Sequence, residues 1–311
     1  IDTVVAFEAE EKGLISPEIF PPVKIHTAEH TPWQMRSRGV PENLIGQVSE
    51  LLKERHRNGV VEYSKSPYTN RWFVIPKKEG GIRFIQDVQP LNKVSIRNAH
   101  APPTAEEIIS RNEGARILTA IDLFSGYDQI QLDPLSRPLT AMRTPIGLIQ
   151  MKVLPMGYTN SVAEFQRAIE IVLGDFQPYL AQNYLDDIVV NSETLRYEGD
   201  EEIEEKTGIR GFIKTHIDLT IKVLRRLRDA GLAISGKKSK FCQKSVEVLG
   251  FEISELGRKP AEKKLDLIGT WPIPKNVKEV RSFLGFLGYN RVFIRDFAVL
   301  SGPLVELTLS L

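Results

Sequence analysis

The chain has 311 residues, of which 41% are hydrophobic and 26% charged, with a formal net charge of +1. These values are typical of a globular protein large enough for one big domain or several subdomains. No stretch approaches the roughly 18 apolar residues that span a bilayer, so we expect no membrane segment. The single cysteine, Cys242, excludes an internal disulfide, and we expect it to be a small buried residue.

The N-terminal stretch "IDTVVAFEAEEKG" has neither an initiator Met nor the basic-then-apolar pattern of a signal peptide. We therefore expect a segment of a longer chain. Residues 1–40 show no periodicity and predict an extended arm.

Regular elements begin at residue 41. Residues 41–59 place apolar side chains at helical spacing between Pro41 and Gly59, which predicts an amphipathic helix. Two β-rich runs, 71–76 and 82–88, are joined by "KKEGG" and predict a hairpin. Thr104 precedes a Glu by three residues, which predicts a capped helix over 104–115.

The middle of the chain alternates strands and helices. Residues 116–122 predict a strand that breaks at Ser125, and 139–154 predict a hairpin that turns at 145–147. Residues 161–176 predict a helix with Ser161 as its cap.

The C-terminal part continues this mixture. It predicts a helix over 216–231, a strand over 246–254 around Gly250, and a helix over 276–294 capped by Asn276. Strands and helices mix without strict alternation, which favours an α+β fold.

The charges are unevenly distributed. Residues 222–240 carry seven Lys or Arg and a single acidic residue, whereas 196–212 are strongly acidic. Basic tracts are more often solvated faces than binding sites. The basic charge of residues 222–240 therefore does not by itself predict a binding site. We interpret the acidic segment as a solvent loop, with binding of a partner protein as the alternative.

Two adjacent carboxylates, Asp186 and Asp187, lie inside the apolar run "NYLDDIVV". Such a pair alone is also typical of an exposed β-turn. A third acid, Asp122, ends another apolar run, "TAIDLF". Three carboxylates on neighbouring strands need a cation, and oxygen ligands suit Mg²⁺. The sequence thus predicts a divalent-metal site for phosphoryl transfer.

The ordered series "IDLFSGYDQI", "TAMRTPIG", "LPMGYTNSVAEFQRA", "YLDD" and "LGFEIS…WPIPKNVKEVRSFLGFLGYNRVFI" resembles the reverse transcriptases of gypsy-type (Metaviridae) LTR retrotransposon Pol polyproteins, fungal copies in particular. The resemblance runs from about Pro41 to Leu307. It implies an RNA-directed and DNA-directed DNA polymerase that adds dNTPs to a primer 3′-OH by a two-metal mechanism.

The resemblance also implies the site residues. Asp122, Asp186 and Asp187 would be catalytic and, with the Leu123 carbonyl, would hold two Mg²⁺ ions, with Mn²⁺ as a possible substitute. The residues implied to contact the nucleotide are Lys77, Arg83, Tyr127, Met156 and Gly157. The residues implied or expected to contact primer and template are Leu249, Gly250, Lys237, Lys238 and Lys240.

A right-hand polymerase is the implied architecture, with an antiparallel palm sheet backed by helices. The expected parts are an arm over 1–40, fingers over 41–100 and 130–157, a palm over 101–129 and 158–257, and the start of a thumb or connection over 258–311. We expect the ribonuclease H, protease and integrase domains of Pol to be absent from this chain. An intracellular location, in cytoplasmic virus-like particles, is implied by the family.

Two rival functions stay open. An RNA-dependent RNA polymerase would use ribonucleotides, but the ring of Tyr127 argues against it by leaving no room for a 2′-hydroxyl. A decayed or domesticated copy would bind nucleic acid as a scaffolding subunit without copying it. The complete set of three acids argues against decay.

Overall fold

The structure is a computed structural model that describes residues 4–36, 39–76, 80–193, 203 and 208–309. Its mixture of helices and mainly antiparallel strands confirms the predicted α+β class. Lys77 and most of the acidic segment predicted as a solvent loop lie outside these described residues. No described helix combines the length and the apolar character that crossing a membrane requires.

A four-stranded antiparallel sheet forms the centre of the molecule. Its order is β11 (Lys240–Gln243), β5 (Leu118–Asp122), β9 (Asp187–Asn191) and β8 (Ala181–Tyr184). Successive side chains of β9 point to opposite faces of the sheet, as the two-residue period of a strand requires. Ile188 and Val190 join one hydrophobic cluster and Val189 joins another, so both faces of the sheet are covered.

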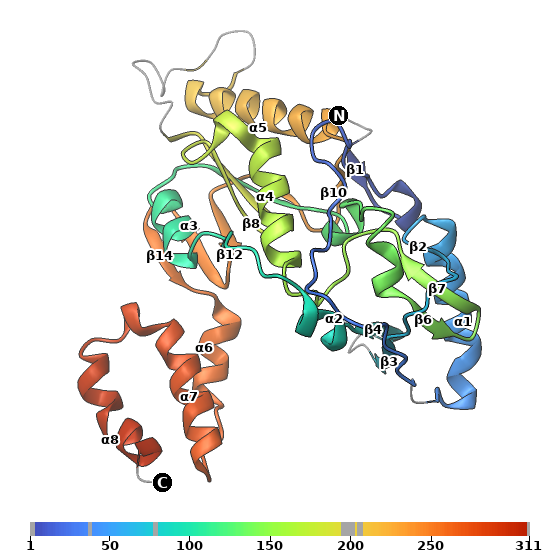
Figure 1. The fold of residues 1–311 in the computed structure, drawn as a ribbon. Helices are drawn as coiled ribbons and strands as arrows, with labels where there is room; N and C mark the ends of the chain where they lie inside the picture. Colours follow the sequence, from blue (N-terminus) through green and yellow to red (C-terminus); the bar gives the residue numbers. More distant parts are fainter. Residues whose placement is uncertain (1–3, 37–38, 77–79, 194–202, 204–207, 310–311) are drawn as a thin grey trace.

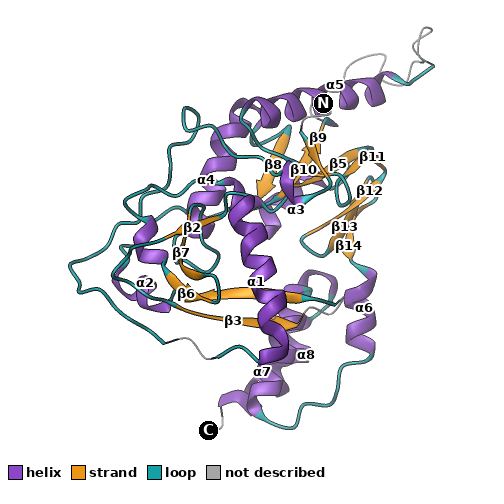
Figure 2. Cartoon of the chain, turned by 90° about the vertical axis from the view of Figure 1, so that its right-hand side faces the viewer, coloured by secondary structure: helices purple, strands orange, loops and turns teal. Residues whose placement is uncertain are grey.

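Two long helices cover one face of this sheet. The helices α4 (Ser161–Leu173) and α5 (Gly211–Asp229) lie side by side, and α4 contacts β8 while α5 contacts β9 (Figures 1 and 2). The sequence predicts that α5 begins at His216, whereas in the structure it begins five residues earlier, at Gly211. The N-cap position of α4 is Asn160, whose side chain makes no capping hydrogen bond, and the predicted cap Ser161 is the first helical residue, with its hydroxyl donating to the Pro155 carbonyl at 2.7 Å.

The opposite face packs against α3 (Ala105–Asn112) and a sheet of β12 (Ser245–Val248), β13 (Phe251–Ser254) and β14 (Gly257–Pro260). The prediction of one strand over 246–254 was wrong. Val248 pairs directly with Phe251 because Leu249 and Gly250 both have left-handed backbones, with φ of 50° and 74°. Their conformation makes a tight hairpin turn.

A second layer of elements lies at the other end of the molecule, beside α1 (Figure 2). The predicted hairpins at 71–88 and 139–154 are confirmed there. One hydrophobic cluster packs Val48 and Leu52 of α1 with Trp72 and Met142 of the strands. The elements of this layer are α1 (Glu42–Arg57), α2 (Gln89–Val94), β2 (Val61–Tyr63), β3 (Arg71–Pro76), β4 (Ile82–Asp87), β6 (Met142–Thr144) and β7 (Gly147–Met151).

The N-terminal arm is part of the core. Its strand β1 (Val5–Ala6) pairs in parallel with β10 (Ile234–Ser235), more than 200 residues later in the chain. Ile15 and Phe20 are each 1% exposed and belong to the same cluster as the central sheet. The arm therefore contributes buried apolar surface to the same core as the central sheet.

The C-terminal helices α6 (Glu262–Gly269), α7 (Val277–Tyr289) and α8 (Phe297–Leu309) extend away from the sheets, at the lower left of Figure 1. The predicted cap of α7 is confirmed, because the Asn276 side chain accepts the Glu279 N–H at 3.0 Å. The predicted cap at Thr104 is confirmed as well.

Cys242 differs from the prediction. It is exposed, because β11 is an edge strand that is irregular at this residue. Its backbone N–H donates to the Thr119 hydroxyl at 3.1 Å.

A buried polar cluster joins α5 to the central sheet. The ring of His216 is fully buried and contacts the hydroxyls of Thr119 at 2.9 Å and Ser192 at 3.0 Å. Burial lowers the pKa of His216 to about 4, although nearby Glu193 acts in the opposite direction. The folded state therefore holds this imidazole neutral at a pH where the unfolded chain would protonate it.

This shift predicts a loss of stability in mild acid. Between pH 6.5 and 4 the unfolded chain binds the extra proton, so the free energy of unfolding falls as the pH falls. The full effect approaches about 3 kcal/mol, and about 1 kcal/mol appears between pH 7 and 5.5. Urea denaturation of the wild type and of His216→Gln at both pH values measures it. Equal pH slopes for the two proteins would contradict the assignment.

Candidate active site

The two strands at the centre of the sheet bring the predicted carboxylates together. Asp122 at the end of β5 is the register partner of Asp187 at the start of β9, directly after the buried pair Ile121 and Ile188. Tyr184 pairs with Asp187, so only two residues form the β8–β9 turn, and Asp186 is the second of them. The rigid, buried hairpin thus fixes all three acids at one end of the sheet.

The electrostatics of this cluster favour a bound cation. Burial, together with the charges of Asp186 and Asp122, raises the pKa of Asp187 to about 6, while Lys238 acts in the opposite direction. Burial also raises the pKa of Asp122, with Lys238 acting in the opposite direction and Asp186 adding to the rise. Carboxylates that resist ionisation in each other's presence are stabilised by a divalent ion, and carboxylate oxygens are the ligands that Mg²⁺ prefers.

The carboxylates are nevertheless not arranged as a finished metal site. Among the described residues, no three His, Cys, Asp or Glu side chains lie in a group that could hold a metal ion as they stand. Instead, the Asp122 carboxylate accepts hydrogen bonds from Lys238 Nζ at 3.1 and 3.2 Å. The donor set fits a metal, but the Asp122 oxygens already have a positive partner.

The backbone next to Asp122 is tied to the same turn. The Leu123 N–H donates to the Asp186 carbonyl at 3.0 Å, and the Leu123 side chain is buried in the core. The strand end and the turn are therefore held together by backbone as well as by pairing. The metal contact expected of the Leu123 carbonyl stays a prediction.

Tyr127 lies beside the carboxylates in the 3₁₀ turn η2 (Gly126–Gln129). Its ring stacks on Phe165 with the centroids 4.8 Å apart, and burial, with a contribution from Asp186, raises its pKa. A Cβ on Gly126 would lie 2.7 Å from the Phe165 ring, so only glycine lets this turn approach α4 so closely. The ring is thus held in a fixed place at the edge of the site.

The comparisons with known proteins place these features in a family. Residues 75–253 match the family model described as "Reverse transcriptase (RNA-dependent DNA polymerase)", and this match includes all three acids. The chain belongs to the reverse transcriptases.

Relatives of this reverse transcriptase are retrotransposon polyproteins. The chain is 30% identical over 281 residues to the transposon Tf2-3 polyprotein of Schizosaccharomyces pombe, covering 90% of the chain and 20% of that protein. It is 32% identical over 307 residues to the Pol polyprotein from transposon opus of Drosophila melanogaster, covering 97% of the chain and 29% of the relative. The predicted kinship with gypsy-type retrotransposons, fungal copies included, is confirmed. The chain spans only about a fifth to a third of these relatives.

Solved structures confirm the predicted fold class, a right-hand polymerase. A foamy viral protease-reverse transcriptase in complex with double-stranded DNA has a TM-score of 0.86 at 23% identity, over 100% of this chain and 51% of that chain. A second foamy viral structure, in complex with an RNA/DNA hybrid, has a TM-score of 0.82 at 23% identity, over 100% of this chain and 39% of that chain.

The remaining predicted nucleotide contacts of the reverse transcriptase lie on two segments. Met156 is 67% exposed, and the Gly157 carbonyl accepts from the Asn92 side chain at 2.9 Å. Asn92 also accepts the Thr159 N–H at 2.8 Å, so α2 fixes this turn from both sides. Arg83 is exposed on β4.

The predicted primer contacts are at the other side of the sheet. The Leu249 carbonyl accepts from the Tyr289 hydroxyl at 2.5 Å, which ties the β12–β13 turn to α7. Lys264 packs across Gly250, and its ammonium lies 3.9 Å from the centroid of the Tyr289 ring. A Cβ on Gly250 would clash with that lysine, so the turn and the first C-terminal helices form one connected unit.

The lysines predicted to contact nucleic acid have different surroundings. Lys238 contacts Asp122, Lys237 forms an exposed ion pair with Glu8 at 3.7 Å, and Lys240 is exposed opposite Ala120. None of these placements tests contact with a primer or template.

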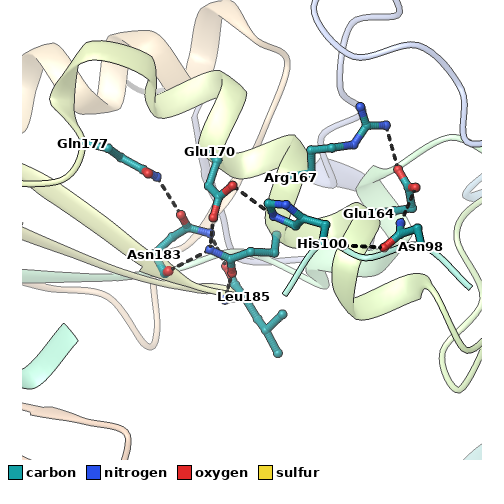
Figure 3. A network of polar contacts seen from close by, with 9 residues as sticks. Asn98, His100, Glu164, Arg167, Glu170, Gln177, Asn183 and Leu185 are labelled. Carbon is teal, nitrogen blue, oxygen red and sulfur yellow. Dashed lines mark hydrogen bonds and ion pairs between the residues drawn. The ribbon is translucent and has the colours of Figure 1, made fainter. Parts of the chain in front are cut away.

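A residue that the sequence analysis did not single out fixes the β8–β9 turn. Gln166 on α4 is 1% exposed, accepts the Leu185 N–H at 2.9 Å and donates to the Asn183 carbonyl at 3.1 Å. Its amide also donates to Glu170, whose other oxygen lies 3.1 Å from His100 Nε2. In Figure 3, Glu170 on α4 lies close to Asn183 and to the backbone of Leu185 in the β8–β9 hairpin. The sequence signal for this role is that Gln166, a polar amide, lies on the apolar face of the predicted helix.

We predict that Gln166→Leu misplaces the turn. It leaves the Leu185 N–H and the Asn183 carbonyl buried without partners, which should lower the free energy of unfolding by about 2 kcal/mol. A shift of Asp186 should also lower kcat for primer extension by about tenfold or more. Urea denaturation and single-turnover extension measure the two effects.

Gln177→Leu is the matched control. It removes one hydrogen bond to the Asn183 side chain and leaves the turn backbone bonded. A Gln166→Leu protein that loses stability but keeps the kcat of the control would show that Gln166 only supports the fold.

Proposed function

We propose that this chain is an RNA-directed and DNA-directed DNA polymerase that adds dNTPs to a primer 3′-OH. One observation carries the proposal: in a member of the reverse transcriptase family, Asp122, Asp186 and Asp187 meet at one end of a buried sheet. In the reaction, the primer oxygen forms a bond to the α-phosphorus of the dNTP, pyrophosphate leaves, and the hydroxyl proton passes to solvent or a base.

The family generally uses divalent metal ions. Here the residues that would hold them are Asp122, Asp186 and the Leu123 carbonyl, with Asp187 in a less direct role. When bound, two Mg²⁺ ions, or Mn²⁺ in their place, acidify the attacking hydroxyl and neutralise charge on the leaving pyrophosphate. The chain itself supplies the fixed positions of these oxygens, and the raised pKa of Asp187, caused by burial and by the neighbouring carboxylates, supports a role for added positive charge at this site.

The nucleotide would lie between the carboxylates and the β3–β4 hairpin. Lys77 and Arg83 would bind the triphosphate, the lysine as a mobile charge and the arginine as a rigid fork. Met156 and Gly157 would line the pocket, and the Tyr127 ring would exclude a 2′-hydroxyl. The exposure of Arg83 and Met156 and the fixed stacking of Tyr127 on Phe165 support these roles.

Primer and template would lie along the sheet and the C-terminal helices. Leu249 and Gly250 would contact the primer backbone, and Lys237, Lys238 and Lys240 the phosphates, independently of sequence. The foamy viral reverse transcriptases of similar fold, in complexes with RNA/DNA hybrid and double-stranded DNA, support this part of the proposal.

The domain division is part of the same proposal. The layer around α1 would form the fingers over 41–100 and 130–157, and the central sheet would form the palm over 101–129 and 158–257. Residues 1–40 would be an arm and 258–311 the start of the thumb or connection. The polyprotein relatives support a role beside other Pol domains. A location in cytoplasmic virus-like particles is a further part of the proposal.

Primer extension on an RNA template, with and without Mg²⁺, tests the proposal. The polymerase is expected to extend only with the metal and with dNTPs. Binding of primer–template without any extension would favour the alternative, a scaffolding copy that does not catalyse. Equal use of dNTPs and rNTPs would favour an RNA polymerase.

A further inference from the structure

Asp122 has a counter-ion of its own in the metal-free chain. Lys238 Nζ lies 3.1 Å from one oxygen of Asp122 and 3.2 Å from the other, so it engages the whole carboxylate. The Asp122 side chain is 17% exposed, whereas that of Lys238 is 67% exposed. The lysine therefore reaches into the site from solvent and can leave without opening the core.

The segment that carries Lys238 is fixed at both ends. It follows β10, which the N-terminal strand β1 holds in place, and it leads into β11 of the central sheet. The Asp122 N–H donates to the Ser239 hydroxyl at 3.1 Å, directly beside the lysine. The backbone is thus anchored next to Asp122 while the long side chain of Lys238 keeps its freedom.

A lysine at this place competes with a metal ion. An ammonium group and a divalent cation need the same carboxylate oxygens, and two positive charges this close repel each other. The described acids do not form a group that could hold a metal ion as they stand, and Lys238 engages both oxygens of the Asp122 carboxylate.

We propose that Lys238 is an internal counter-ion that pairs with Asp122 in the metal-free enzyme. A divalent ion must displace this lysine in order to bind, and the competition weakens metal binding before the substrate arrives. The inference rests on the proposed function, since it takes Asp122 as a metal ligand. It assigns Lys238 a positioning role in setting metal affinity, separate from any contact with nucleic acid. Because the lysine of this pair is mostly exposed, solvent screens the attraction, and a divalent ion can replace it.

The test measures ion binding in the absence of nucleic acid and nucleotide. Mn²⁺ is titrated into the full chain, and the free ion is followed by electron paramagnetic resonance. We expect Lys238→Gln to lower the Kd for Mn²⁺ by about threefold to tenfold. Lys237→Gln is the matched control, because it removes the same charge from the same segment but pairs with Glu8 and not with Asp122.

The outcomes separate the two proposals. If the wild-type chain binds no Mn²⁺, the metal site and the proposed mechanism are overturned. The same holds if the Asp186→Asn variant binds Mn²⁺ with the affinity of the wild type. If the wild type binds Mn²⁺ but Lys238→Gln binds it no more tightly than Lys237→Gln does, only the role of Lys238 is overturned.

A second measurement uses the unmodified sequence. Lysines of the wild-type chain are acetylated with and without Mn²⁺, and the rate at each position is read by mass spectrometry. Release from Asp122 should raise the rate at Lys238 by about threefold, while Lys237 stays unchanged. Equal rates at Lys238 with and without bound Mn²⁺ would show that the ion does not displace it.

Discussion

Replacing Asp186 by asparagine is expected to abolish primer extension while primer–template binding is kept. The substitution keeps the size of the side chain but removes a charged oxygen from the two-residue turn beside Asp122 and Asp187. Loss of a metal ligand should raise the barrier by several kcal/mol, which leaves less than about 1% of the wild-type rate. Single-turnover extension and a filter-binding or anisotropy titration measure the two properties.

Asp218→Asn serves as the control for the loss of one carboxylate, because Asp218 is exposed on α5. It should retain the wild-type rate. Residual synthesis by Asp186→Asn above about 1% would contradict the metal role of Asp186, because a tenfold change in rate corresponds to only about 1.4 kcal/mol. Asp187→Asn should be compared in the same assay, since its role is proposed to be less direct.

The second large effect is expected at Tyr127, in the choice of sugar. Tyr127→Ala removes the ring that stacks on Phe165 and opens the place where a 2′-hydroxyl would lie. We expect the ratio of kcat/KM for dNTP over rNTP to fall by roughly 100-fold, equivalent to about 2.7 kcal/mol of discrimination. Extension with matched dNTP and rNTP series on one template measures this ratio.

Tyr127→Phe separates the ring from its hydroxyl. It keeps the stacking surface and should keep most of the discrimination. If the alanine variant still preferred dNTPs as strongly as the wild type, sugar selection would have to come from another residue.

Local signals were enough to predict part of the fold and the centre of the site. The side chains of Thr104 and Asn276 cap helices as their spacing to a following Glu predicts. Acids embedded in apolar runs predict Asp122, Asp186 and Asp187 as site residues, and the strands that bury those runs place Asp122 beside Asp187, next to the turn that carries Asp186. The information for each cap, and for each embedded acid taken singly, lies within a few residues of the feature.

Other features depend on contacts that no local pattern contains. The strand predicted over 246–254 is divided in the structure, because Leu249 and Gly250 both take left-handed backbones and turn it into a hairpin. Lys238 lies 116 residues from Asp122 in sequence, so the ion pair could not be predicted from either segment. The position of Gln166 on an apolar helix face is a weak local signal, but it does not predict which backbone groups the amide binds, because the β8–β9 turn lies on another element.

The N-terminal arm has a consequence for how such polymerases change over time. The region that matches the family begins at residue 75, but Ile15 and Phe20 already complete the core of the central sheet and β1 pairs with β10. The unit that folds is therefore longer than the block that defines the family. Recombination that exchanged the catalytic block alone between two elements would separate the sheet from the arm that fits it, whereas a crossover upstream of the arm would pass on a compatible pair.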